Sequence, residues 1–182
     1  MATVIDVNLL PRICAATVAL VLATTIAGCS SPTTTPTPTP TPDPTFTEEE
    51  AFALAEETFR EYLAEIETLD YTDISDIDRL ARFSTKSYFA GERKSVVNGI
   101  LDGQSIVGST ELLWFRPYET IDNTTVIALI CEDISNAHIV DSDGKKLTPD
   151  DRPDLSARRI TFKQDGDMFI IAAAEAVRTK EC

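Results

Sequence analysis

The sequence predicts an α+β fold in which three helices precede an antiparallel sheet. Between residues 47 and 103, apolar residues recur at the three- and four-residue spacing of amphipathic helices. After Gly103, short β-branched and alternating segments are separated by turn residues such as Asp-Gly. Helices that come before the strands, rather than between them, are typical of the α+β class.

The first predicted helix covers residues 48–69. Thr47 and Glu50 have the spacing of a capping box, in which each residue satisfies a backbone amide of the other. The apolar face that follows consists of Phe52, Ala55, Phe59, Tyr62, Leu63 and Ile66. This face predicts that the helix packs against a core.

Two further helices are predicted before the strands begin. Asp76 is the expected N-cap of a short helix that carries Ile77 and Leu80. Ser84 is the expected N-cap of a third helix, which contains Tyr88 and ends near residue 102.

The predicted strands cover residues 105–107, 110–118, 124–131, 137–140, 156–163 and 168–177. The segment 124–131 is nearly continuous in β-branched and apolar residues, which predicts a central strand covered on both faces. Turns are expected at residues 122–123 and 141–144, and a hairpin turn at residues 164–167.

The beginning of the chain, residues 1–28, fits a signal peptide. Its apolar run ends at Ile26 and is shorter than the roughly 20 residues that a transmembrane helix needs. The run Ile26-Ala27-Gly28-Cys29 resembles the lipobox of bacterial lipoproteins. That resemblance implies cleavage before Cys29, attachment of diacylglycerol to its thiol, lipidation that includes palmitate, and anchoring on the extracytoplasmic face of the cell membrane. The alternative is a buried helix followed by an ordinary cysteine.

Residues 29–45 form a Thr/Pro-rich linker between this anchor and a folded domain at residues 46–182. Alternating prolines remove amide donors and favour polyproline II, so neither a helix nor a sheet is expected there. Such a spacer reaches about 50 Å. We expect it to hold the domain away from the lipid surface.

The lipobox, the linker and three features of the domain together resemble small actinobacterial lipoproteins. The three features are the strand that ends in residues 129–133, the turn at residues 143–145 and the terminal hairpin before Cys182. These proteins carry a cone-shaped domain like that of nuclear transport factor 2. The resemblance implies three N-terminal helices packed on a curved antiparallel sheet.

Of the four cysteines, Cys131 and Cys182 remain in the domain after processing. An even pair in an exported domain predicts a disulfide bond. The alternatives are two buried free thiols, or a catalytic Cys131 activated by His138.

The candidate pocket residues are aromatic or basic side chains expected between the helices and the sheet: Trp114, Arg116, Tyr88, Phe59 and Tyr118. Arg116 is of interest because an inward guanidinium would hold an anionic ligand, although an outward strand arginine is the alternative. His138 is the only histidine, and we interpret it as a surface or hydrogen-bonded strand residue.

No metal or cofactor site is expected. One histidine without spare thiols does not make a transition-metal site. The turn at residues 141–144 resembles the start of a calcium loop, but Arg152 stands in place of its bidentate glutamate. The net charge of −14 argues against nucleic acids as partners.

Three functions remain open. The first is a non-enzymatic domain that binds a small ligand or a cell-envelope protein. The second is an enzyme of the cyclase or isomerase type, which would place an acid or His138 in the cone pocket. The helical faces expected to form that pocket carry no acid, which favours the first. The third is a purely structural envelope subunit.

Overall fold

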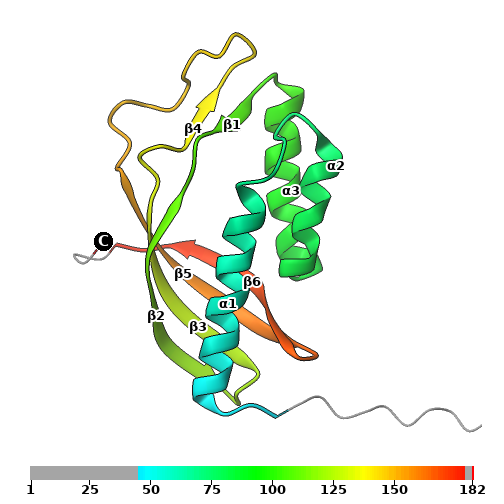
Figure 1. The fold of residues 1–182 in the computed structure, drawn as a ribbon, viewed down its shortest axis with the longest axis vertical. Coiled ribbons are helices and arrows are strands. Elements are labelled where there is room, and N and C mark those ends of the chain that lie inside the picture. The colour runs from blue at the N-terminus through cyan, green and yellow to red at the C-terminus, as the bar shows by residue number, and fades with distance from the viewer. Residues whose placement is uncertain (1–44, 179–181) are drawn as a thin grey trace, which may run out of the picture. The chain divides into compact units, whose positions relative to one another are not determined.

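The structure is a computed structural model that describes residues 45–178 and Cys182 (Figure 1). The predicted signal peptide, Cys29 and most of the predicted linker lie outside the described residues. The elements are α1 Glu48–Ile66, α2 Ile74–Ile77, the 3₁₀ helix η1 Asp78–Phe83, α3 Lys86–Leu101, β1 Ser105–Val107, β2 Glu111–Ile121, β3 Thr125–Asp133, β4 His138–Val140, β5 Leu155–Asp165 and β6 Met168–Ala176. The predicted α+β class is confirmed.

The strands form two antiparallel sheets. Four strands pair in the order β2-β3-β5-β6, and β1 pairs with β4 in a separate two-stranded ribbon. Helix α1 contacts β2, β3 and β6, and Figure 1 shows it running along the four-stranded sheet. The ribbon lies beyond one end of that sheet, beside the loop that joins β4 to β5 (Figure 1).

The core lies between α1 and one face of the four-stranded sheet. On β3, Val126, Ala128 and Ile130 are fully buried, whereas Ile127 and Leu129 between them are only half-buried. Successive strand residues point to opposite faces. The prediction that this strand is covered on both faces is therefore wrong, because helices cover only one of them.

Side-chain caps begin the helices. The capping box of Thr47 and Glu50 is confirmed. Asp73 caps α2 in place of the predicted Asp76, and Thr85 caps α3 in place of the predicted Ser84. Ser84 is unavailable as a cap because it is buried and forms a β-bridge to β6.

The predicted disulfide is confirmed. Cys131 of β3 is bonded to Cys182, with an S–S distance of 2.00 Å and a Cα–Cα distance of 5.5 Å. Cys131 is fully buried. The bond therefore fixes the end of the chain to a central strand, and the alternatives of free thiols or a catalytic Cys131 are not supported.

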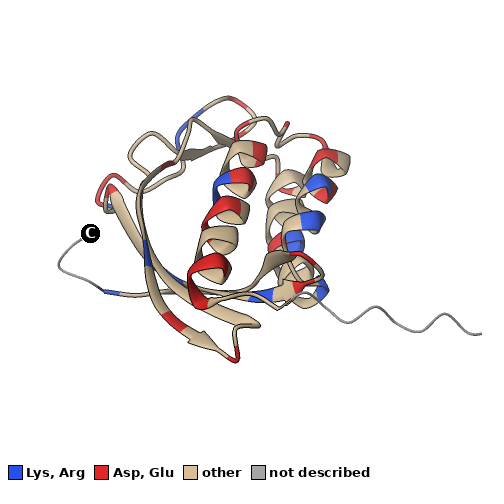
Figure 2. Cartoon of the chain, turned by 60° about the horizontal axis from the view of Figure 1, so that its bottom comes forward, with Lys and Arg blue, Asp and Glu red and all other residues tan. Residues whose placement is uncertain are grey.

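Acidic residues dominate the charge of the chain. Figure 2 shows Asp and Glu along α1 and in the loops. Within residues 45–178, none of the helices is both long and apolar enough to cross a membrane.

Candidate functional site

A cavity of about 510 Å³ lies at the end of the core next to the β1–β4 ribbon. Its volume is in the range of small-molecule binding sites. Much of its wall is apolar and comes from α1, η1, α3, both ribbon strands and the loops around them. These apolar residues include Leu63, Ile66, Ile77, Leu80, Phe89, Val96, Ile106, Ile134, Ile139 and Leu147.

The buried face of the sheet becomes polar where it reaches the cavity. Glu132 lies two residues after the buried Ile130 of β3. Arg158 lies two residues before the buried Ile160 of β5. The register places Arg158 opposite Ile130 and Ser156 opposite Glu132. Glu132 and Arg158 are thus diagonal neighbours on the inner face of the sheet.

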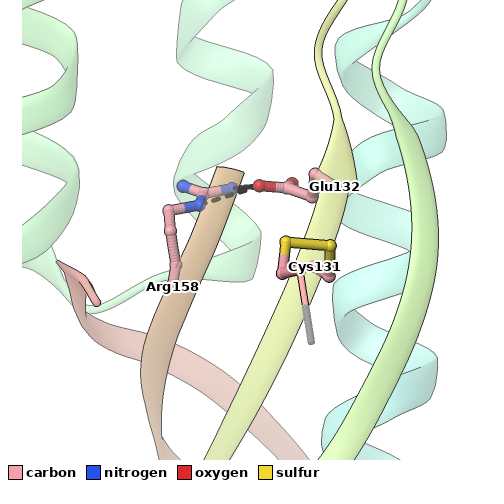
Figure 3. The surroundings of a disulfide bond; sticks show 4 residues. Cys131, Glu132 and Arg158 are labelled. Atoms are coloured by element: carbon pink, nitrogen blue, oxygen red, sulfur yellow. Dashed lines mark hydrogen bonds and ion pairs between the residues drawn. A yellow bond between two sulfur atoms is a disulfide. The ribbon is translucent and has the colours of Figure 1, made fainter. Parts of the chain in front are cut away.

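Glu132 and Arg158 form a bidentate ion pair at the cavity, as Figure 3 shows. Arg158 donates from Nε to Oε2 of Glu132 at 2.9 Å and from Nη2 to Oε1 at 2.7 Å. The side chain of Glu132 is only 2% exposed, while that of Arg158 is 27% exposed. Burial lowers the pKa of Arg158, but Glu132 outweighs this effect, and the pKa lies above its ordinary value. Arg158 therefore keeps its charge, and the ion pair with Glu132 balances it.

Two tyrosines from different helices also line the cavity, close enough to this ion pair for the charge of Arg158 to act on both phenols. Burial raises the pKa of Tyr62 in α1 far above its ordinary value, and Tyr88 and Glu92 raise it further. Burial raises the pKa of Tyr88 in α3 to about 12, with a further contribution from Glu92. Both phenols are protonated near neutral pH, so each offers a hydrogen-bond donor to the cavity.

His138 lies on the cavity wall, at the start of β4. Its Nδ1 atom is buried and has no hydrogen-bond partner among the described residues. The interpretation of His138 as a surface or hydrogen-bonded strand residue therefore needs correction. The adjacent amide of Ile139 donates instead to Oγ1 of Thr148, at 2.8 Å.

Other charged residues lie around the cavity. Arg93 is paired with Asp78, with Nε of Arg93 at 2.6 Å from the carboxylate. Arg152 donates to the backbone carbonyl of Ile134. Glu92 also contributes to the lining, so the helical faces that form the cavity do carry an acid, contrary to our expectation. In the described part of the chain, no group of three or more His, Cys, Asp or Glu residues is placed to hold a metal ion.

Of the five predicted pocket residues, the structure places only Tyr88 at the cavity. Phe59 is 1% exposed and belongs to the core. Trp114, Arg116 and Tyr118 lie on β2 outside the cavity lining. The Arg116 guanidinium stacks on the Trp114 ring at 4.2 Å, so an inward arginine that holds an anion is not what the structure shows.

The strand register explains these placements. Phe115 occupies the core side of β2, where its ring lies 6.4 Å from that of Phe59 and 6.0 Å from that of Phe162. Its neighbours Trp114 and Arg116 consequently point to the other face. Two register shifts in β2, after Leu112 and after Pro117, are irregularities that the alternation of the sequence does not reveal.

Sequence reasoning missed three residues of the site. Tyr62 was assigned to the apolar face of the first helix, although it also lines the cavity. Glu132 and Arg158 were not recognised as a pair. The available signal was their two-residue spacing from the buried Ile130 and Ile160, which puts a charged side chain on the core face of each strand.

No protein-family model matches this sequence, and no curated protein matches it. Among solved structures, the crystal structure of the intermembrane space region of the chloroplast protein ARC6 is similar, with a TM-score of 0.48 and 14% sequence identity. The match covers 69% of this chain and 95% of that one. Similarity at this level indicates neither a family nor a function.

The raised pKa of Tyr88 predicts a specific loss of stability in alkali. An unfolded tyrosine loses its proton near pH 10, whereas Tyr88 in the folded state keeps it to about 12. Between these values the unfolded state binds fewer protons, so the free energy of unfolding falls as pH rises. We expect Tyr88→Phe to reduce that fall when denaturant unfolding is measured between pH 10 and 12. The exposed Tyr118→Phe is the control, and an equal fall in both variants would contradict the prediction.

Proposed function

We propose that this protein is a lipid-anchored extracytoplasmic protein whose domain binds a small, largely apolar molecule without catalysis. In this proposal the helices pack into a curved sheet to form a cone-shaped domain, and the ligand occupies the cavity. Cys29 anchors the chain to the membrane, and residues 29–45 hold the domain away from it.

The cavity at the end of the core is the observation that carries this proposal. Its apolar residues favour burial of an apolar ligand body, and its polar groups can fix the orientation of that ligand. The carboxylate of Glu132 is held by both donors of Arg158. It is therefore not free to act as a general base, which favours binding over catalysis.

Filling the cavity tests the proposal. Val96 lies on α3, is half-buried and lines the cavity. We expect Val96→Trp to weaken binding of the fluorescent apolar probe N-phenylnaphthylamine by about tenfold or more, because the larger side chain occupies the ligand's space. Fluorescence titration of the purified full chain measures this.

Lys94→Trp is the matched control, since it introduces the same side chain at an exposed position of the same helix. It should bind the probe like the unmodified protein. Equal affinity in the two tryptophan variants would show that the probe does not bind in this cavity.

The proposed anchor makes a prediction about the mature protein. If the lipobox is processed, the mature chain begins at Cys29, which carries diacylglycerol. Mass spectrometry of the protein from its native membranes should find this acylated N-terminus, and Cys29→Ser should release the protein from the membrane fraction. A mature protein that still contains residues 1–28, or one in which Cys29 is unmodified, would refute the anchor.

An enzyme of the cyclase or isomerase type is the second candidate, and the position of His138 favours it. The residue lines the cavity, and its Nδ1 atom has no hydrogen-bond partner among the described residues, so this nitrogen is not committed to a structural hydrogen bond. Under the binding proposal, His138→Ala changes the affinity for N-phenylnaphthylamine only a few fold. Turnover of an enolisable ketone that disappears in His138→Ala would establish the enzyme instead.

A further inference from the structure

We infer that the ligand of the cavity is a neutral, mostly apolar molecule with one acceptor oxygen, such as a ketone, which accepts hydrogen bonds from the hydroxyls of Tyr62 and Tyr88. This inference rests on the proposed function and specifies the chemistry of the ligand.

The hydroxyl of Tyr62 is the first observation. Tyr62 is only 8% exposed, and no hydrogen bond joins its hydroxyl to another residue in the described part of the chain. The hydroxyl is not among the buried unpaired atoms of the described residues, so it is open to whatever occupies the cavity. Its ring is held by Phe59 and Phe83, with ring centroids 6.0 and 6.1 Å away. The donor is therefore fixed in place and uncommitted.

The hydroxyl of Tyr88 provides a second donor in the same region. It too has no hydrogen bond to another described residue. Both phenols line the cavity, and both sense the charges of Arg158 and Glu92. Tyr62 comes from α1 and Tyr88 from α3, and the two phenols are close enough for Tyr88 to raise the pKa of Tyr62. Two convergent donors are complementary to one acceptor oxygen.

The electrostatics of this region favour a neutral acceptor. The charge of Arg158 is already matched by Glu132. Glu92 adds a negative charge that raises the pKa of both phenols, and it would also disfavour an anionic ligand beside them. A cationic head would lie near the Arg158 guanidinium, whose like charge disfavours it.

Three probes with one apolar body test this inference: acetylnaphthalene, ethylnaphthalene and naphthoate. Their affinities for the purified full chain are measured by ligand-observed NMR titration. We expect acetylnaphthalene to bind about threefold to tenfold more tightly than ethylnaphthalene, the ratio expected for a net hydrogen bond of ordinary strength. Naphthoate should bind more weakly than the ketone.

The variants Tyr62→Phe and Tyr88→Phe remove one donor each and keep the aromatic ring. Each should weaken acetylnaphthalene binding about threefold to tenfold and leave ethylnaphthalene binding unchanged. Tyr118→Phe, which removes a hydroxyl from a 57% exposed residue outside the cavity, should change neither affinity.

Several results would overturn the inference. One is equal affinity for the ketone and the hydrocarbon, and another is a preference for the ketone that survives both substitutions. Tighter binding of naphthoate than of acetylnaphthalene would overturn the neutral class. In each of these cases the proposed function still stands if ethylnaphthalene binds to the unmodified protein and Val96→Trp abolishes that binding. If none of the three probes binds, the inference and the proposed function both fail.

Discussion

Arg158→Met should lower the free energy of unfolding by about 3 kcal/mol at neutral pH, the lower end of the range for breaking a buried ion pair. The reason is the carboxylate of Glu132, which is 2% exposed and would be left without a counter-charge. The lower end applies because the Arg158 side chain is 27% exposed, so water already reaches it in part. Denaturant unfolding followed by circular dichroism measures the effect.

Two controls separate the ion pair from general effects of substitution. Arg60→Met breaks the pair with Glu56, which has a similar distance of 2.7 Å but side chains that are 56% and 37% exposed. It should cost less than about 1 kcal/mol. The double variant Glu132→Leu/Arg158→Met should recover most of the loss, because it leaves no isolated charge. An Arg158→Met cost no larger than that of Arg60→Met would contradict the account.

Loss of the disulfide bond should have a comparable effect. The Cys131–Cys182 bond links residues separated by 51 positions, and such a loop corresponds to a stabilisation of about 4 kcal/mol on the chain-entropy model. We expect about 2–4 kcal/mol for Cys182→Ala. This variant is preferable to Cys131→Ala, which would also create a cavity at a fully buried position.

A reducing agent provides the control for the disulfide. It should lower the stability of the unmodified protein toward that of Cys182→Ala, and it should leave the variant unchanged. Thiol labelling of the native protein should find neither Cys131 nor Cys182 free. Quantitative labelling of both would show that the bond is absent.

The two effects concern one stretch of β3. Cys131 and Glu132 are adjacent, and Figure 3 shows the disulfide and the ion pair side by side on this strand. The disulfide therefore attaches the end of the chain to the position of β3 that precedes Glu132.

Features with local causes could be predicted from the sequence. The capping box at Thr47 needs only two residues three apart, and the structure contains it. The turn at Asp122 and Asn123 is also present, with φ values of 52° and 53° that both residue types tolerate. Strand β1 has the predicted bounds, and the other strands differ by a few residues.

The cavity could not be predicted, because its residues meet only through long-range packing. Trp114 was predicted as a pocket residue on the assumption that side chains alternate regularly along its strand. The register of β2 is instead changed by irregularities near Leu112 and Pro117. Glu132 and Arg158 are 26 residues apart and become neighbours only when β3 pairs with β5. The half-buried position of His138 depends in the same way on the pairing of β4 with β1.

The position of a bound probe tests the central claim most directly. Intermolecular nuclear Overhauser effects can be measured between acetylnaphthalene and the side chains of the purified full chain. We predict contacts from the probe to Tyr62, Tyr88 and Val96, and none to Trp114, which lies outside the cavity. Contacts to Trp114 and Tyr118 in the absence of contacts to Tyr88 would place the ligand on the other face of the sheet and contradict the account.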